Sequence, residues 1–121
     1  MDDITQEELN AKIKQHSLWL NSDGQEGEQI YLQSTDLGDL DFENADLRYA
    51  DLQYASLRFA DLQEADLRWA DLQEVNFYKA NLRGADLRGA NLDGTNLEYA
   101  NLRGAILDEN FLKQKENQEN E

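Results

Sequence analysis

The chain has 121 residues and carries 26 acidic against 11 basic side chains, a net charge of −15. This length predicts one domain, and the charge disfavours binding to nucleic acid or an anionic membrane but suits a basic partner. The chain has no cysteine, starts with Met1-Asp2-Asp3 rather than with a secretion signal, and contains no apolar stretch of transmembrane length. We therefore expect a soluble, cytoplasmic protein without disulfides.

Residues 5–20 have the pattern of an amphipathic helix. Thr5 and Glu8 form a capping box at its start, and one face carries Leu9, Ile13, His16, Trp19 and Leu20. A helix this short is marginal alone in water. We expect it to cover the N-terminal end of the repeat that follows, where unpaired backbone groups and apolar side chains need a cap. Residues 1–29 are thus predicted to be a helical cap and connector.

Residues 30–109 repeat a five-residue word, Ala-Asp/Asn-Leu-x-x, without insertion. Sixteen central positions follow at five-residue steps from Leu32 to Leu107, and all are Leu except Phe42 and Phe77. Ala stands two residues before the centre in eleven words, and Asp or Asn stands one residue before it in thirteen. A period sustained over this length decides the architecture before local propensity does.

The five-residue period excludes both ordinary elements. In an α-helix each central Leu would be rotated by roughly 140° from the last, which leaves no apolar stripe. In a long strand, successive Leu residues would point to opposite faces. Within one word, however, Ala and Leu point the same way if the word is extended. If the chain turns at the two variable residues, every Ala and Leu can face a common axis.

A longer period indicates the number of sides, although Arg and Gln also alternate at ten residues between Arg48 and Gln73. Arg48, Arg68 and Arg88 recur at twenty residues, as do Gln33, Gln53 and Gln73. Twenty residues are four words, which fits a square coil with one word per side. We expect the Asp and Asn side chains to bond nearby backbone. The glycine corners at 84, 89, 94 and 104 are expected to form type II turns, and bulkier corners to turn otherwise.

The repeat resembles the pentapeptide repeat family. That resemblance implies an all-β solenoid, a right-handed quadrilateral β-helix of about four coils over residues 30–109, with Ala and Leu inward. After Asp108 the pattern ends. Phe111 and Leu112 are expected to cover the last coil on a turn capped by Asp108, and the polar residues 113–121 to form a disordered tail. Residues 110–121 thus make the third segment.

No group of residues predicts catalysis. The single histidine, His16, lies on the docking face of the predicted helix, so a packing role is expected. The carboxylates are spread along the repeat, whereas a calcium site needs several oxygens in one tight turn. We expect no enzyme activity, no cofactor and no metal.

Two outward-facing features are candidates for partner binding. Four aromatic residues stand at corners, where they either shield the stacked backbone or form a protein-binding or dimer patch: Tyr49, Tyr54, Phe59 and Trp69. One side of the tube, face 1 (residues 30–34, 50–54, 70–74 and 90–94), has no basic residue and four acidic ones: Asp51, Asp71, Glu74 and Asp93.

These features predict a non-enzymatic scaffold or protein-binding module whose partner the sequence does not identify. The alternative comes from the family resemblance, since some pentapeptide repeat proteins resemble duplex DNA in shape and charge and bind bacterial DNA gyrase in its place. This chain lacks the protruding loops and the longer tube of that pattern. A homodimer through a coil end or through the aromatic patch is a further alternative.

Overall fold

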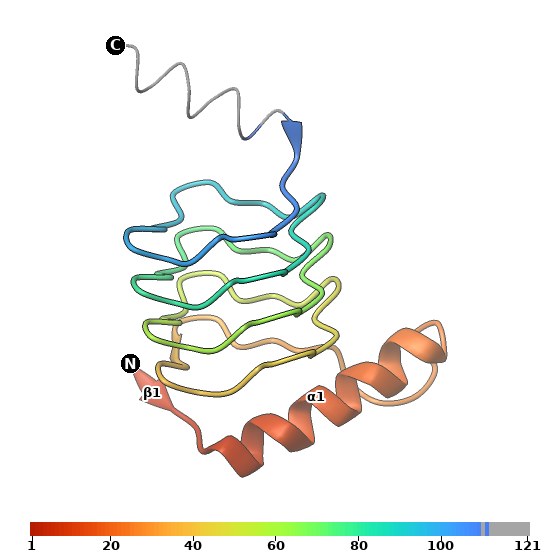
Figure 1. The fold of residues 1–121 in the computed structure, drawn as a ribbon. Coiled ribbons are helices and arrows are strands. Elements are labelled where there is room, and N and C mark those ends of the chain that lie inside the picture. The colour runs from red at the N-terminus through yellow and green to blue at the C-terminus, as the bar shows by residue number, and fades with distance from the viewer. Residues whose placement is uncertain (110, 112–121) are drawn as a thin grey trace.

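The computed structural model describes residues 1–109 and 111. Residues 30–109 wind into coils that stack along one axis (Figure 1). Twelve parallel bridges join residues that stand before a centre to residues 20 positions later, from Tyr31 with Asp51 to Asp86 with Ile106. This register gives four coils of four words each and so four faces. Beside face 1 these are face 2 (35–39, 55–59, 75–79, 95–99), face 3 (40–44, 60–64, 80–84, 100–104) and face 4 (45–49, 65–69, 85–89, 105–109).

The axis of the tube is filled by the central residues and the residues two before them. Leu47, Leu67 and Phe77 are fully buried, and Ala50 and Ala70 line the wall beside them. Each buried Leu contributes about 1.5–3 kcal/mol, and the small alanines let the backbone of each side pass close to the axis. The inward assignment of these two positions is therefore confirmed.

The corners all use one backbone geometry, which corrects the prediction that bulky corners turn differently. Tyr49, Tyr54, Phe59 and Trp69 have φ between +60° and +64°, close to the +70° of Gly84. The residue after the corner donates its N–H to the preceding central carbonyl, as at each bulky corner and at Gly84. A positive φ at the third residue of such a turn defines type II. Each non-glycine corner bears a cost of about 1–2 kcal/mol, because Cβ crowds the backbone there.

Glycine occurs at corners chiefly because space is missing. A Cβ on Gly84 would overlap the carboxylate of Glu64, and a Cβ on Gly89 would overlap the ring of Trp69. A Cβ on Gly104, by contrast, would make only ordinary van der Waals contacts. The Trp69 ring thus folds over the corner of the next coil, where Gly89 leaves room for it, whereas other large corner residues, such as Phe59, are followed in the next coil by a residue with a side chain.

The Asp and Asn residues before each centre fix the path of every side. All thirteen accept a hydrogen bond from the backbone N–H two residues later, as Asp61 Oδ1 does from Gln63 at 3.1 Å. The predicted local bonding of these side chains is confirmed, and it explains why the position is so uniform.

The N-terminal residues lie against the first coil. Helix α1 (Gln6–Asn21) begins at the capping box of Thr5 and Glu8, as predicted. It runs across the end where the chain enters the tube (Figure 1). The sequence did not predict strand β1 (Asp2–Asp3), which pairs in parallel with β2 (Thr35–Asp36) of the first coil.

Two side chains of α1 bond the first-coil edge that no preceding coil pairs. Gln6 donates from Nε2 to the Asp41 carbonyl and accepts the Asp41 N–H at Oε1, both at 2.8 Å. His16 accepts the Ile30 N–H at Nδ1, at 2.9 Å, and contacts the Arg48 carbonyl through Nε2 at 2.8 Å. Together with β1, these bonds pair backbone groups of the first coil that a preceding coil would otherwise pair.

At the other end the ladder stops at Asp108. The Gly89 N–H, which in earlier coils would meet a backbone carbonyl, donates instead to Asp108 Oδ2 at 2.9 Å. Phe111 is partly buried, and its N–H donates to the Asp108 carbonyl at 3.1 Å. The expected contributions of Leu112 and residues 113–121 lie outside the described residues. Among the residues that are described, no helix is long and apolar enough to cross a bilayer.

Candidate interaction surfaces

The single histidine, His16, packs between α1 and the first coil and hydrogen-bonds to the backbone there. His16 is fully buried and stacks on Trp19 at 5.6 Å between ring centroids. Because Ile30 donates to Nδ1, the proton must sit on Nε2, which donates to the Arg48 carbonyl. Burial lowers the pKa of His16 below its usual value, despite the hydrogen bond to Arg48 and the nearby Asp46 carboxylate, which act in the opposite direction. A histidine held in this way supports the fold and is closed to a substrate.

Face 1 places its four predicted acidic residues in two different settings. The carboxylate of Asp51 accepts from the amides of Gln33 and Gln53 at 2.9 and 3.0 Å, and that of Asp71 accepts from Gln73 at 2.9 Å. Both are half-buried. Glu74 and Asp93 are exposed, and within the described chain neither carboxylate has a hydrogen bond or ion pair.

The four predicted aromatic residues do not form one patch. They are all exposed, between 48% and 58%, but the twenty-residue register spreads them over three corners. Tyr49 and Trp69 share one corner, Tyr54 stands at the next and Phe59 at a third. Trp69 lies over Gly89, which supports the shielding role for that ring.

Around Phe59 the structure assembles a cluster on face 2 that the sequence analysis missed. Tyr78 packs edge-on against Phe59 at 6.0 Å and against Tyr99 at 5.8 Å. The guanidinium of Arg58 and the ammonium of Lys79 each lie within 5.8 Å of both the Phe59 and Tyr78 ring centres, close enough for cation–π attraction. Tyr99 is 78% exposed. We call these five residues the aromatic–cationic cluster; positions 59, 79 and 99 differ by twenty, so the register could have revealed it.

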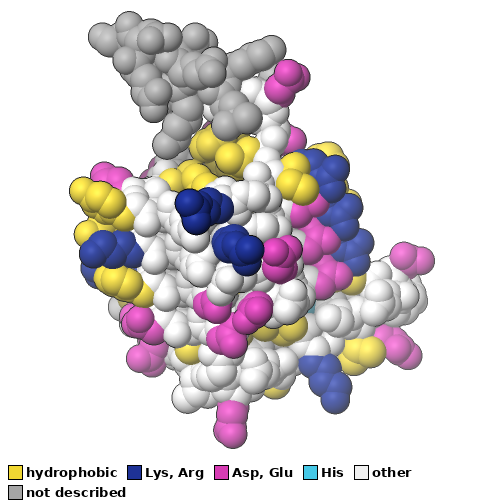
Figure 2. Space-filling view, in the orientation of Figure 1, with side chains coloured by type: hydrophobic (Ala, Val, Ile, Leu, Met, Phe, Trp, Pro, Cys, Tyr) yellow, Lys and Arg dark blue, Asp and Glu magenta, His cyan; other side chains and the backbone are white. Residues whose placement is uncertain are grey.

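Face 4 carries a ladder of alternating charges. Arg48, Arg68 and Arg88 each chelate the aspartate two residues earlier, with Nη2–Oδ2 distances of 2.6–2.7 Å. Arg48 and Arg68 also reach the aspartate of the next coil at 3.7 Å. These hydrogen bonds lower the pKa of Asp46 and of Asp86. The ladder appears as adjacent blue and magenta columns at the right of Figure 2. Its charges are paired within the chain.

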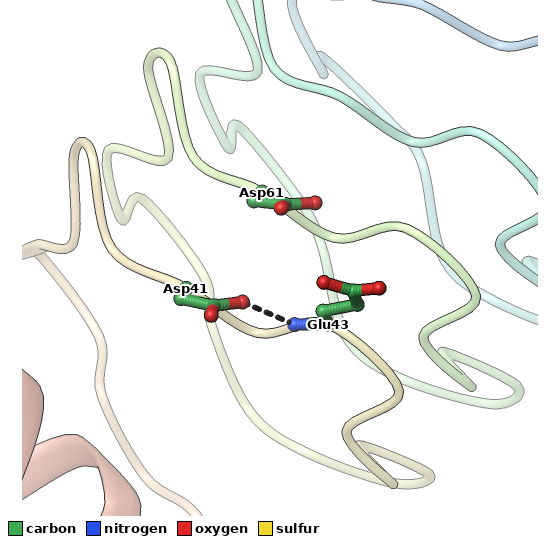
Figure 3. Close-up of side chains that lie close together, drawn as sticks. All are labelled: Asp41, Glu43 and Asp61. Atoms are coloured by element: carbon green, nitrogen blue, oxygen red, sulfur yellow. Dashed lines mark hydrogen bonds between the residues drawn. The ribbon is translucent and has the colours of Figure 1, made fainter.

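Face 3 is divided into an acidic half and a basic half. In the first two coils the carboxylates of Asp41, Glu43 and Asp61 lie within 4.8 Å of one another (Figure 3). In the last two coils the same face carries Arg83 and Arg103, whose guanidinium groups have no partner among the described residues. Figure 2 shows basic side chains above acidic ones on one side of the tube. Asp41 and Asp61 keep the expected regular spacing of the aspartates, but Glu43 joins them in a cluster of three carboxylates across two coils.

Comparisons with known proteins agree with this architecture. A family model described as pentapeptide repeats matches eight copies over residues 29–58, 50–89 and 70–108. A search of curated proteins finds no match. Among solved structures, the pentapeptide repeat protein alr5209 from Nostoc PCC 7120 is 35% identical, with a TM-score of 0.64 over 78% of this chain and 74% of its own. Rfr23 from the cyanobacterium Cyanothece 51142 is 32% identical, with a TM-score of 0.53 over 72% of this chain and 66% of its own.

Proteins of this kind form right-handed quadrilateral β-helices, and the four-sided coils of residues 30–109 follow that plan. The repeat match covers most of the chain, and alr5209 exceeds 30% identity over more than two thirds of it. The chain belongs to the pentapeptide repeat family.

Proposed function

We propose that the protein is a non-enzymatic binding module that contacts a partner protein through the aromatic–cationic cluster of face 2. The observation that carries this proposal is a surface group of three aromatic rings, two exposed and one (Tyr78) half-buried, with two cations, on a chain of net charge −15. Exposed tyrosines with neighbouring arginine are typical of the centres of protein interfaces. An aromatic surface flanked by two positive charges fits a partner segment with apolar and acidic side chains.

The cluster is not required by the fold. Phe59 adopts a φ of +60°, a geometry that glycine adopts at four other corners of the tube. Tyr99 is largely in solvent, so little of its apolar surface stabilises the tube. The positive φ of Phe59 is common to the corners, so it is the exposure of the rings that favours a role outside folding.

The test is capture of partners from a bacterial lysate with three versions of the full-length protein. Phe59→Ser/Tyr99→Ser removes two rings of the cluster, and Tyr49→Ser/Tyr54→Ser removes two exposed corner rings elsewhere. A partner that the parent and the control retain, and that the cluster variant loses, supports the proposal. Partners retained equally by all three would contradict it.

A second candidate is a DNA mimic that binds DNA gyrase or another DNA-binding enzyme through face 1. The supporting observation is that Glu74 and Asp93 are exposed and unpaired on a face without a cation. Four coils at about 4.8 Å spacing make a tube roughly 19 Å long, and residues 30–109 carry a net charge of −9. This is about one net charge per 2 Å of axis, near the density of duplex DNA.

The mimic is tested by a gyrase supercoiling assay. The parent is compared with Glu74→Lys/Asp93→Lys and with Glu98→Lys/Glu109→Lys, which makes the same change in charge on other faces. The mimic requires inhibition by the parent and a much larger loss of inhibition in the first variant than in the second. No inhibition by the parent removes gyrase as the target, and equal losses reduce the effect to nonspecific attraction.

A further inference from the structure

We propose that face 3 is a self-complementary surface through which two copies of this chain associate with their tubes antiparallel. This inference does not depend on the binding function proposed above. It starts from the division of face 3, in which the first two coils carry acidic side chains and the last two carry unpaired arginines.

The twenty-residue register arranges the outward side chains of face 3 in columns parallel to the tube axis. The column before the centre reads Asp41, Asp61, Asn81, Asn101, and the column after it reads Glu43, Gln63, Arg83, Arg103. Each column therefore begins with acceptors and ends with donors. Neither column contains a cation in the acidic half or a carboxylate in the basic half.

The acidic half has charge that the chain itself does not neutralise. Asp41 Oδ1 accepts the Glu43 N–H at 2.8 Å, and Asp61 Oδ1 accepts the Gln63 N–H at 3.1 Å, but no cation contacts the cluster within the described residues. Like charges this close repel one another. A surface that brings a cation to one of these carboxylates and amide donors to the other two would relieve that repulsion.

The basic half is open to such a contact. Arg83 and Arg103 line a shallow groove beside two stacked glycine corners, Gly84 and Gly104. The carboxylate of Glu64, from the second coil, lies over Gly84 in the same groove but forms no ion pair with either arginine in the described part of the chain. Since neither guanidinium has a partner in the described part of the chain, both are free to chelate a carboxylate. In this respect they differ from Arg48, Arg68 and Arg88, each of which is held by its own aspartate.

Two-fold symmetry then determines which residues meet. A two-fold axis in the interface plane and perpendicular to the tubes reverses the order of the coils and keeps each column opposite itself, so coil 1 faces coil 4 and coil 2 faces coil 3. The opposing pairs are Glu43 with Arg103, Gln63 with Arg83, Asp41 with Asn101, and Asp61 with Asn81. In these two columns every acidic side chain faces a donor, and each pair occurs twice; the corner residue Glu64 faces Gly84.

The parallel arrangement is disfavoured by the same pattern. An axis along the tubes would place coil 1 opposite coil 1, so that the carboxylates of Asp41 and Glu43 would face those of the second copy. Like charges directly opposite one another are repulsive. The antiparallel pairing is therefore the one that the charges select.

The size of the face sets the strength of the association. A face about 19 Å tall and at most about 17 Å wide, the reach of five extended residues, covers roughly 320 Å², which is much less than the roughly 800 Å² per partner of stable complexes. We therefore expect a reversible dimer that depends on its charge pairs. At physiological ionic strength, charges farther apart than about 8 Å are largely screened, so facing side chains count for more than the overall charge of −15 on each copy.

The experiment is a charge exchange between two variants, followed by sedimentation equilibrium of the purified full-length protein. Arg103→Glu and Glu43→Arg each turn two attractive pairs into two repulsive ones in the homodimer. When the two variants are mixed, every introduced charge faces an opposite charge again. We expect each variant alone to dimerise at least tenfold more weakly than the parent and the equimolar mixture to recover the affinity of the parent. Recovery also shows that both variants are folded.

The matched controls are Lys12→Glu on α1 and Glu98→Arg on face 2, which make the same changes in net charge away from face 3 and should dimerise like the parent. A parent that is monomeric at all accessible concentrations overturns the proposal. So does a mixture that does not recover, or a loss in the controls equal to that in the face 3 variants. Because only purified protein is used, failure here leaves the partner-capture result unaffected.

Discussion

The tautomer of His16 makes the stability of the cap depend on pH. Ile30 donates to Nδ1 and Nε2 donates to Arg48, so both ring nitrogens are used only when the ring is neutral. Protonation would place a second N–H against the Ile30 N–H. The charged groups near the ring are Asp46, which favours protonation, and Arg48, which opposes it; burial is the largest influence and lowers the pKa.

The sign of the effect follows from this lowered pKa. Below the unperturbed value of 6.5, the unfolded chain binds a proton that the folded chain does not. Stability is therefore complete above about pH 6.5 and falls as the pH falls toward the folded pKa, by about 1.4 kcal/mol per pH unit. Between about pH 6.5 and pH 5 the loss amounts to at most about 2 kcal/mol. The lowered pKa values of Asp46 and Asp86 act in a more acidic range.

The matched variant is His16→Gln, which offers one acceptor and one donor and does not titrate. Gln6 shows that a glutamine side chain can bond both an N–H and a carbonyl of this coil edge. We expect His16→Gln to be less stable than the parent at pH 8 by about 1–3 kcal/mol, because its fit is imperfect. The difference should shrink by up to about 2 kcal/mol toward pH 5. The assay is urea unfolding of both proteins across this range, and a difference that stays constant would refute the reasoning.

Three further predictions concern the tube itself. Gly89 and Gly104 have similar φ, +74° and +70°, but only a Cβ on Gly89 would collide with Trp69. Gly104→Ala should therefore destabilise the protein by about 1–2 kcal/mol, and Gly89→Ala by about 1–3 kcal/mol more. Equal losses of stability in urea unfolding would show that the ring does not fill this space. Leu67→Asp places an unpaired charge on the axis and should unfold the protein, so a variant with the circular dichroism and melting temperature of the parent would disprove the inward assignment. Deletion of residues 1–22 removes β1, Gln6 and His16 from the first-coil edge and should cause association or precipitation, whereas a monomeric product with unchanged melting temperature would show that α1 is no cap.

The tube could be predicted from the sequence because every five-residue word has the same pattern of apolar and polar residues. Ala and Leu at fixed positions define the axis, and the Asp or Asn between them bonds the backbone two residues on, as Asp61 does. Each word is weak evidence alone, but sixteen in one register leave no other period. The helix Gln6–Asn21 was predictable for a different reason, since its capping box marks its start within one residue.

The corners and the N-terminal strand could not be predicted from local preference. Tyr54 and Trp69 disfavour a positive φ, yet the coil imposes it because all words have the same length and must turn through the same angle. Strand β1 has two aspartates and no strand propensity. It pairs with Thr35–Asp36 because the first coil offers an edge, and this edge exists only in the folded tube.

The twenty-residue register identified face 1 from the sequence, but the aromatic residues were grouped by type and corner position, and so the cluster on face 2 was missed. Tyr49 and Phe59 are both aromatic corners but stand on different sides. Phe59 and Tyr99 are forty residues apart in sequence and belong to one cluster through Tyr78. Once the twenty-residue register is known, the residues of one column can be listed from the sequence, as the residues of a helix face can. The same listing shows that face 3 has an acidic half and a basic half.

The columns also distinguish residues whose contacts stabilise the tube from residues that make no stabilising contact in it. Trp69 fills the space above Gly89, and Arg68 is chelated by its own aspartate, so both have local explanations. Tyr99 adopts a φ of +60° and is 78% exposed, and Arg103 has no partner among the described residues. The positive φ of Tyr99 is common to the corners, but its exposed ring and the unpaired charge of Arg103 do not stabilise the coil. These two positions, on faces 2 and 3, are therefore where binding should be tested first.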